Sequence, residues 1–249
     1  MLETHAALEI FEEIDSTSLE ARRRAERGEY GPVWLMARAQ SAGRGRRGRA
    51  WSSLPGNLMA TYLGRTARPP GEIALLGFAA GVALAEAAEE WIGPGRAALK
   101  WPNDLMLDGA KAAGLLIDSG SAPGGHWFAL GLGLNILDAP EGLDQETAAL
   151  ARALAPGAQA PSPEAMLKRV RARLEARADA LTREGFAPLR QAWLARAYGL
   201  GQTARVTLGS ENVEGRLVGL SPQGELELET RTGLRLIAAG DVLFAPTTA

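Results

Sequence analysis

Three glycines alternate with four arginines in the segment 40–51, which reads QSAGRGRRGRAW. Glycine is costly inside a helix, by about 1 kcal/mol relative to alanine, and it weakens a strand. A glycine backbone does, however, approach a ligand closely, and its amide groups form concave anion sites. Arginine adds fixed charge and forked donors that match phosphate and carboxylate. The segment predicts a loop that folds over an anionic nucleotide, with Trp51 as a stacking surface, or else a solvated basic loop or nucleic-acid contact.

Lysine is rare in this chain. Of its 27 basic residues, only Lys100, Lys111 and Lys168 are lysine, and the first two lie within one stretch of twelve residues. A compact ammonium group behaves differently from a planar guanidinium and loses its proton more readily. The retained lysines are therefore candidates for chemistry, with chance retention as the alternative.

The overall composition limits the function classes. The net charge is −2 and the sequence pI is about 5.9, whereas a dedicated nucleic-acid-binding domain is usually basic. The chain has no cysteine and only two histidines, which argues against disulfides and zinc sites. No run of 18 apolar residues and no signal peptide is evident, so we expect a cytoplasmic protein without a membrane partner.

Patterning predicts the elements that position these residues. Alternating and apolar runs predict strands at 7–14, 33–39, 57–63, 97–101, 105–107, 112–118 and 127–136, with a loop at 120–125. Helical spacing predicts helices at 18–27, 72–91, 146–154, 164–183 and 186–197. Five further short strands, at 204–208, 213–220, 225–229, 234–237 and 242–244, predict a small barrel.

Two local features bear on a ligand. Thr17 and Glu20 have capping-box spacing, so Ser16 and Thr17 either cap a helix or face a ligand at its N-terminus. Gly131 and Gly133 lie inside a predicted strand, where glycine is unfavourable unless something must come close. We expect these glycines to make room for a ligand on the sheet.

Four pieces, in this order, resemble the biotin–protein ligases. They are Asp15-Ser16-Thr17, the segment 40–51, Lys100-Trp101-Pro102-Asn103-Asp104 with Lys111 and Gly114, and the segment 131–135. The resemblance covers essentially the whole chain. It implies an α+β fold with a central mixed sheet flanked by helices, as in class II synthetases, in residues 1–199, and a small SH3-like barrel in residues 200–249.

The resemblance also implies a reaction in two steps. Biotin and ATP, with Mg²⁺, give biotinyl-5′-AMP and pyrophosphate, and a lysine of a biotin carboxyl carrier protein then takes the biotin. The site residues carried over for catalysis are Lys111 and Arg44. Those for biotin are Ser16, Thr17, Ser18, Gln40, Gly43, Arg44, Gly45, Arg46, Lys111, Gly114 and Gly131. Those for ATP are Arg46, Arg47, Arg49, Trp51, Asn103, Asp104, Lys111, Gly133 and Asn135, with Asp104 as the metal ligand. Lys100 is given a structural or supporting role.

The chain departs from the family pattern in two respects. Only about a dozen residues precede Ser16, so we expect the ligase-only form without an N-terminal DNA-binding domain and without DNA as a partner. Ser18 stands where the family often has Asn, so a contact from that side chain is shorter or lost. Family members commonly pair sheet to sheet, which leaves a homodimer open.

Two other functions stay open at this point. One is a lipoate–protein ligase of the same fold, against which the glycine–arginine segment argues. The other is a non-catalytic biotin or nucleotide-binding module, against which the joint retention of Asn103, Asp104 and Lys111 argues. We also expect residues 43–50 to be mobile without ligand, because three glycines and four mutually repelling arginines have little reason to pack, and to close when biotin binds.

Overall fold

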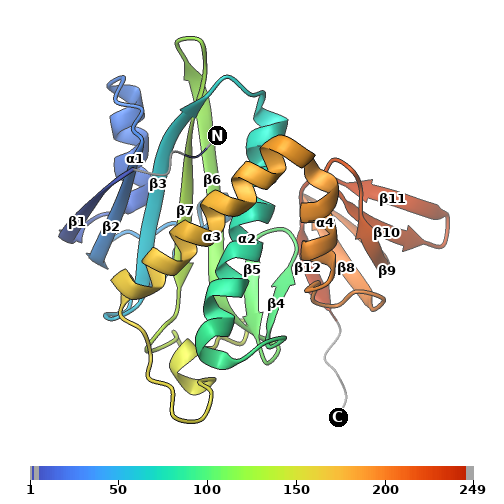
Figure 1. The fold of residues 1–249 in the computed structure, drawn as a ribbon. Coiled ribbons are helices and arrows are strands. Elements are labelled where there is room, and N and C mark those ends of the chain that lie inside the picture. The colour runs from blue at the N-terminus through green and yellow to red at the C-terminus, as the bar shows by residue number, and fades with distance from the viewer. Residues whose placement is uncertain (1, 3–5, 245–249) are drawn as a thin grey trace.

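The computed structural model describes residues 2 and 6–244, and its larger unit is a seven-stranded mixed sheet (Figure 1). The strand order is β1-β2-β3-β7-β6-β5-β4; β1 and β2 are parallel, and the other neighbours are antiparallel. The strands are β1 (Ala7–Ile14), β2 (Val33–Gln40), β3 (Leu58–Thr66), β4 (Ala97–Lys100), β5 (Asp104–Leu107), β6 (Ala110–Ala122) and β7 (Gly125–Leu134).

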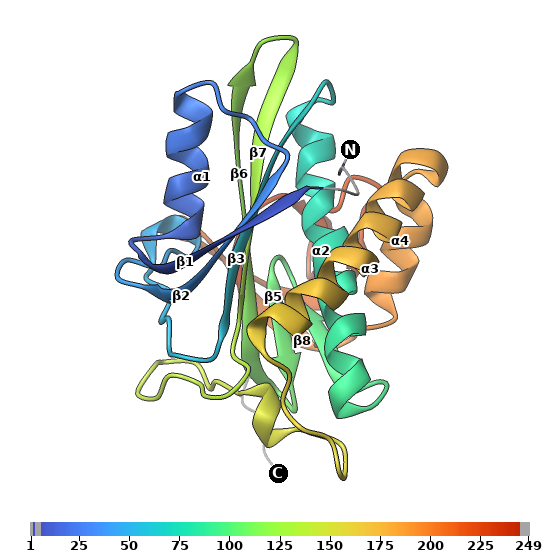
Figure 2. The same ribbon diagram turned by 60° about the vertical axis from the view of Figure 1, so that its left-hand side comes forward.

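Helices cover the two faces of this sheet unequally. Helix α1 (Thr17–Glu26) lies on one face, while α2 (Pro70–Ile92) and α3 (Pro163–Glu184) lie on the other, followed by α4 (Phe186–Leu194), as Figure 2 shows. Helix α2 is long and apolar enough to cross a membrane by length and composition alone. Its Leu76, Leu84 and Ile92 are buried in the main hydrophobic cluster, so α2 is the core helix of this domain.

The last part of the described chain forms a second, five-stranded antiparallel sheet. Its strands are β8 (Thr203–Leu208), β9 (Glu211–Leu220), β10 (Leu226–Thr230), β11 (Gly233–Ile237) and β12 (Asp241–Phe244). All five predicted strands are present. Their order is β11-β10-β9-β8-β12, so the edge strands of the described sheet do not pair and no closed barrel forms. An open sheet of this kind is consistent with an SH3-like domain.

Two predicted elements are wrong. The helix expected at 146–154 is only a short 3-10 turn, Leu150–Arg152, because its backbone groups bond elsewhere. The amide of Ala148 bonds to the carbonyl of Lys111, and the amide of Leu150 bonds to Asn135. The loop expected at 120–125 is the end of a long β6–β7 hairpin, which pairs as far as Ala122 and Gly125.

The start of α1 also differs from the prediction by one residue. Ser16, and not Thr17, is the N-cap, and its hydroxyl accepts from the amide of Leu19 at 3.5 Å. Glu20 therefore plays no part in a capping box and instead pairs with Arg23 and Arg24 along the helix. The shift places Thr17 on the first turn of α1, beside the end of β2.

Candidate active site

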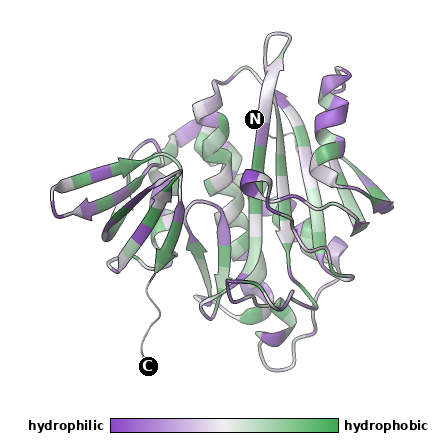
Figure 3. Cartoon of the chain, turned by 180° about the vertical axis from the view of Figure 1, so that it is seen from behind, coloured by the Kyte–Doolittle hydropathy of each residue, from purple (hydrophilic) through white to green (hydrophobic). Residues whose placement is uncertain are grey.

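A pocket lies where the first turn of α1, the ends of β2 and β3 and the middle of β6 and β7 meet, on the sheet face that carries α1. Figure 3 shows this face, which α2 and α3 leave uncovered. Residues from each of the four motifs line it: Ser16, Thr17, Ser18, Gln40, Arg44, Gly45, Arg46, Arg49, Trp51, Asn103, Lys111, Gly114, Gly131, Gly133 and Asn135. The fold thus brings together segments that lie more than a hundred residues apart in the sequence.

Two paired glycines, Gly114 and Gly133, lie in the floor of the pocket. Gly133 of β7 pairs with Met59 on one side and with Gly114 on the other, and Gly114 pairs with Asp104 of β5. A Cβ atom on Gly133 would lie 2.5 Å from the Trp51 ring, and one on Gly114 would lie 3.1 Å from it. Gly114 and Gly133 therefore make room for Trp51, whereas the sequence predicts that Gly133 makes room for a ligand.

Gly131 makes room in the same way for α1. A Cβ atom there would lie 2.8 Å from Ser18 Oγ, which also contacts Thr61 Oγ1 at 3.3 Å. Thr61 in turn donates to Thr17 Oγ1 at 2.9 Å. The hydroxyl groups of α1 and β3 thus form a short chain at one end of the pocket.

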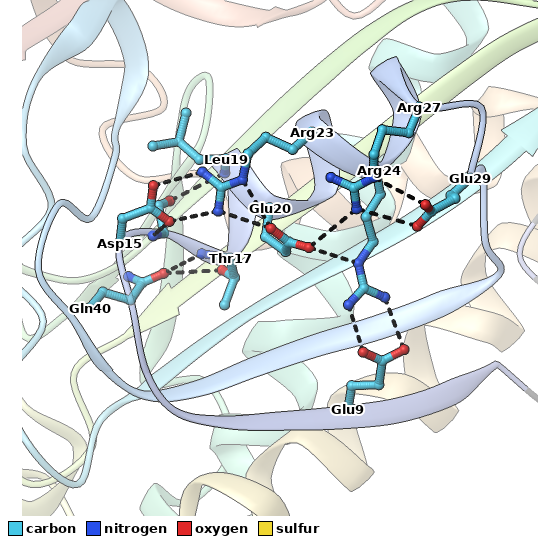
Figure 4. Close-up of polar contacts among 11 residues, drawn as sticks. Glu9, Asp15, Thr17, Leu19, Glu20, Arg23, Arg24, Arg27, Glu29 and Gln40 are labelled. Carbon is cyan, nitrogen blue, oxygen red and sulfur yellow. Dashed lines mark hydrogen bonds and ion pairs between the residues drawn. The ribbon is translucent and has the colours of Figure 1, made fainter.

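Gln40 links the end of β2 to this chain. Its side-chain oxygen accepts from the Thr17 amide at 2.8 Å and from the Thr17 hydroxyl at 3.1 Å, as Figure 4 shows. Asp15, just before the helix, forms a two-pronged ion pair with Arg23, at 2.7 and 2.9 Å. That guanidinium lowers the pKa of the Asp15 carboxyl. The pair ties the β1–α1 connection to the helix and so fixes the side chains that precede and begin α1.

Lys111 lies near the start of β6, at the opposite side of the pocket. Its ammonium nitrogen lies 2.7 Å from Asp104 Oδ1 and 6.0 Å from the centre of the Trp51 ring. Its backbone amide bonds to the carbonyl of Glu146, which fixes the strand against the following loop. Lys100 pairs with Asp104 across β4 and β5 but does not line the pocket. Burial lowers the pKa of Lys100, and the charge of Asp104 opposes this effect.

The arginine loop (residues 40–51) folds over the pocket as a small hairpin between β2 and β3. Arg44 and Ala50 form an isolated antiparallel bridge, and Gly45 donates its amide to Arg49 at 2.8 Å. Arg46 donates to Asn103 Oδ1 at 3.2 Å, and burial lowers the pKa of its guanidinium. The loop therefore has defined contacts in the absence of ligand.

Three predicted residues do not line the pocket. Gly43 is buried at the base of the loop, where a Cβ atom would lie 2.5 Å from the Trp51 carbonyl oxygen. Arg47 points to Asp241 of the second sheet, with 2.9 Å between Nη1 and Oδ2. Asp104 lies behind Lys111, with which it is paired.

Asn135 has an acceptor that the protein leaves unused. The residue is 2% exposed, and its side-chain nitrogen donates to the Ala148 carbonyl at 3.2 Å. This bond fixes the amide so that Oδ1 is buried without a hydrogen-bond partner. A buried acceptor without a partner is costly, so Asn135 Oδ1 has the capacity to accept a hydrogen bond from a ligand donor.

The sequence analysis missed the loop that follows Asn135. Pro140, Leu143, Gln145 and Thr147 line the pocket, and the Gln145 side-chain nitrogen is buried without a partner. We had placed part of this segment in a helix. The unusual proportion of proline and glycine at 140–142 was the available signal.

The described residues contain no cluster of three or more histidine, cysteine, aspartate or glutamate side chains that would hold a metal on its own. Asp104 is the carboxylate that pairs with Lys111, next to the oxygen-bearing side chain of Asn103. Carboxylate and amide oxygens are ligand types that Mg²⁺ accepts together with substrate phosphates, but here each is engaged, by Lys111 and by Arg46.

Comparison with known proteins agrees with this geometry. Residues 11–135 match the biotin/lipoate A/B protein ligase family, and residues 199–244 match the biotin protein ligase C-terminal domain. A biotin–[acetyl-CoA-carboxylase] ligase of Paracoccus denitrificans is 39% identical over 92% of this chain and 97% of its own length. The chain belongs to the biotin protein ligase family. A Mycobacterium tuberculosis ligase with the same description is 32% identical over 95% of this chain and 88% of its own.

A solved structure supports the same assignment. The biotin protein ligase of Aquifex aeolicus, in complex with biotin and ATP, superposes with a TM-score of 0.79. It is 26% identical and covers 96% of this chain and 98% of its own. The α+β fold of this family member, with a mixed sheet flanked by helices and a second antiparallel sheet, is therefore confirmed.

Proposed function

We propose that the protein is an ATP-dependent biotin–protein ligase that forms biotinyl-5′-AMP in the pocket described above. The observation that carries this proposal is the convergence of Lys111, the arginine loop and the unpartnered acceptor of Asn135 on one pocket. Adenylate formation requires a positively charged group that neutralises the biotin carboxylate and the α-phosphate. It also requires a polar side chain that hydrogen-bonds the adenine base. Two relatives named as biotin ligases align with this protein over most of its sequence.

In the first step the biotin carboxylate attacks the α-phosphate of ATP, and pyrophosphate leaves. Two anions must approach each other, so the protein must neutralise charge and align the reactants. Lys111 is the point charge that we assign to both groups, with Arg44 beside it. Lys111 gives up its contact with Asp104 as the substrates arrive.

We assign the biotin ring to the end of the pocket that holds the hydroxyl chain. Ser16, Thr17 and Gln40 supply donors and acceptors there, and Ser18 is a short side chain over Gly131. Gly43 supports this end indirectly, because it allows the base of the loop to close on Trp51. Gly45, Arg46 and Gly114 complete the assigned contacts with biotin.

We assign the nucleotide to the end formed by Trp51, Gly133 and Asn135. The indole packs on adenine, and the free Oδ1 of Asn135 accepts from the exocyclic amino group of the base. We assign Arg46, Arg47 and Arg49 to the phosphates, which Arg47 would reach only by leaving Asp241, and Arg46 donates to Asn103. Once free of Lys111, Asp104 would supply a carboxylate to Mg²⁺, and the ion would add positive charge at the phosphates.

In the second step a lysine of a carrier protein attacks the mixed anhydride, and AMP leaves. The two relatives named above are ligases for acetyl-CoA carboxylase, so the acceptor we propose is a biotin carboxyl carrier domain. We place the catalytic domain at residues 1–199 and the SH3-like domain at residues 200–249. The same proposal places the protein in the cytoplasm, where such carriers are made, and leaves a homodimer to be tested.

Pyrophosphate release tests the proposed function. Purified protein with ATP and Mg²⁺ should release pyrophosphate when biotin is added and should not do so with lipoate. A preference for lipoate would make the protein a lipoate ligase, which the matched family also includes. Absence of release with either acid, under conditions where both substrates bind, would leave a non-catalytic binding module.

A further inference from the structure

The second sheet contacts the arginine loop through one turn. Asp241, the first residue of β12, has one carboxylate oxygen 2.9 Å from Arg47 Nη1 and the other 3.0 Å from Arg49 Nη2. The carbonyl of the preceding Gly240 accepts from Arg46 at 3.5 Å. Three loop arginines therefore meet two consecutive residues that lie almost two hundred positions later in the chain.

The sheet fixes the position of this turn. Asp241 pairs with Thr207 of β8, and a Cβ atom on Gly240 would lie 2.7 Å from Val206 of the same strand. Glycine thus allows the turn to lie directly on β8. The carboxylate is presented by a regular sheet and not by a mobile loop, so it is a defined anchor for the arginines.

The backbone conformation of Arg47 in the arginine loop indicates that its surroundings constrain it. Arg47 has φ 54°, a left-handed conformation that residues other than glycine seldom adopt. Such a conformation persists where the surroundings determine it. The ion pair with Asp241 is a contact that holds Arg47 in this conformation.

Two opposing effects of Asp241 on ATP binding can be weighed. The carboxylate competes with phosphate for two arginines, but the side chains are 41%, 63% and 31% exposed for Arg47, Arg49 and Asp241, and such pairs are weak. The same two pairs also keep the guanidinium groups of Arg47 and Arg49 ordered before ATP arrives, and a group that is already ordered loses less conformational entropy when a ligand binds. The ordering effect should therefore prevail.

We propose that Asp241 is a positioning residue that holds Arg49, which lines the pocket, and Arg47, which lies next to the pocket in the same loop, before ATP binds. The second sheet thereby prepares the loop for the triphosphate of ATP, whose larger charge takes over the two guanidinium groups. This inference rests on the proposed function for the identity of the ligand. Its structural part, the holding of the loop, does not depend on activity.

The test uses Asp241→Asn, which removes the charge and keeps the size of the side chain. Glu211→Gln is the matched control, because it removes a carboxylate paired with Arg235 in the same sheet, at 2.7 Å. In ligand-free Asp241→Asn, trypsin should cleave the loop about three- to tenfold faster than in wild type. The KM for ATP should rise about three- to tenfold, the range expected for two exposed ion pairs, while kcat and the KM for biotin stay within about twofold. Asp241→Glu should restore most of both effects.

Unchanged loop cleavage in Asp241→Asn would overturn the proposal, and so would a lower KM for ATP, because competition would then outweigh ordering. An equal effect in Glu211→Gln would also overturn it, since general loss of charge would be the cause. The cleavage assay needs no turnover. If the wild-type protein releases no pyrophosphate with biotin, the proposed function fails, while the cleavage rates still decide whether Asp241 holds the loop.

Discussion

Lys111 stands at the meeting point of the proposed reactants. It is paired with Asp104 at 2.7 Å, lies 6.0 Å from the centre of the Trp51 ring and lines the pocket beside Arg44 and Arg46. Lys111 could be identified as a candidate from the sequence because lysine is rare in this arginine-rich chain. The pairing of Lys111 with Asp104 did not follow from the sequence, because it depends on how β5 and β6 pair, and their register shifts between Leu105 and Met106.

Lys111→Ala should lower the rate of biotin-dependent pyrophosphate release by about 100-fold or more, the usual cost of losing one charge-stabilising group. Lys111→Arg should also be poor, because a planar fork does not replace a point charge in a crowded site. Lys168→Ala, at an exposed position on α3, is the control and should behave as wild type. Near-normal release in either Lys111 variant, with its thermal unfolding unchanged, would remove Lys111 from the mechanism.

Asn135→Ala should weaken ATP binding more than biotin binding. The lost contact with the base corresponds to about 1–3 kcal/mol, or about 5- to 150-fold in Kd. Calorimetric titration with each substrate measures the two affinities separately. A larger loss of biotin affinity than of ATP affinity would contradict the assignment of the two ends of the pocket.

At the scale of elements, β7 carries both ends of the site on alternate residues. Gly131 faces Ser18 and Gly133 faces Trp51, on the same side of the strand. The sequence predicted that something must lie close to these glycines. It could not show that side chains of α1 and of the arginine loop occupy the space, because that depends on how the loop folds back.

The two glycines provide a matched pair of variants. Gly133→Ala would place a Cβ atom 2.5 Å from the indole, so it should displace Trp51 and raise the Kd for ATP by about tenfold or more. Gly131→Ala would crowd Ser18 at 2.8 Å and should weaken biotin more than ATP. Binding assays with each ligand check both. Equal losses for both ligands in both variants would show that the strand, and not either end, is disturbed.

The arginine loop shows what the sequence predicted and what it missed. Its position between two neighbouring antiparallel strands is confirmed. The argument for mobility rested on three glycines and on the mutual repulsion of four arginines, but the Asp241 carboxylate pairs with two of these arginines and offsets part of their charge. The sequence did not predict this ion pair, because Asp241 lies almost two hundred residues after the loop and the sequence of β12 contains no motif that would pair it with residues 46–49.

Ligand-dependent closure of the loop remains a prediction. Biotin or the adenylate should slow trypsin cleavage after the four loop arginines, because bound carboxylate and phosphate hold groups that are exposed in the free protein. ATP alone should protect less than biotin alone if biotin binds first. Equal cleavage with and without ligand would mean a preformed loop, and the ordered binding would have to be abandoned.

For the whole molecule, the architecture followed from patterning and from the four motifs because long runs with clear periodicity determine it. The described part of the fold has all five short C-terminal strands and the long core helix. The helix expected at 146–154 was mispredicted, because three amide groups of this segment bond to the distant carbonyls of Lys111, Asn135 and Ile136. Tertiary contacts of this kind leave no local periodicity to read.

The central claim is that this pocket joins biotin to AMP. The most direct test incubates the protein with biotin, ATP and Mg²⁺ without a carrier, and then measures the mass of the small molecule that remains bound. We predict about one equivalent of biotinyl-5′-AMP on the wild-type protein, little or none on Lys111→Ala, and its disappearance when a biotin carboxyl carrier domain is added. Bound biotin and ATP that stay unreacted on the wild-type protein would contradict the account.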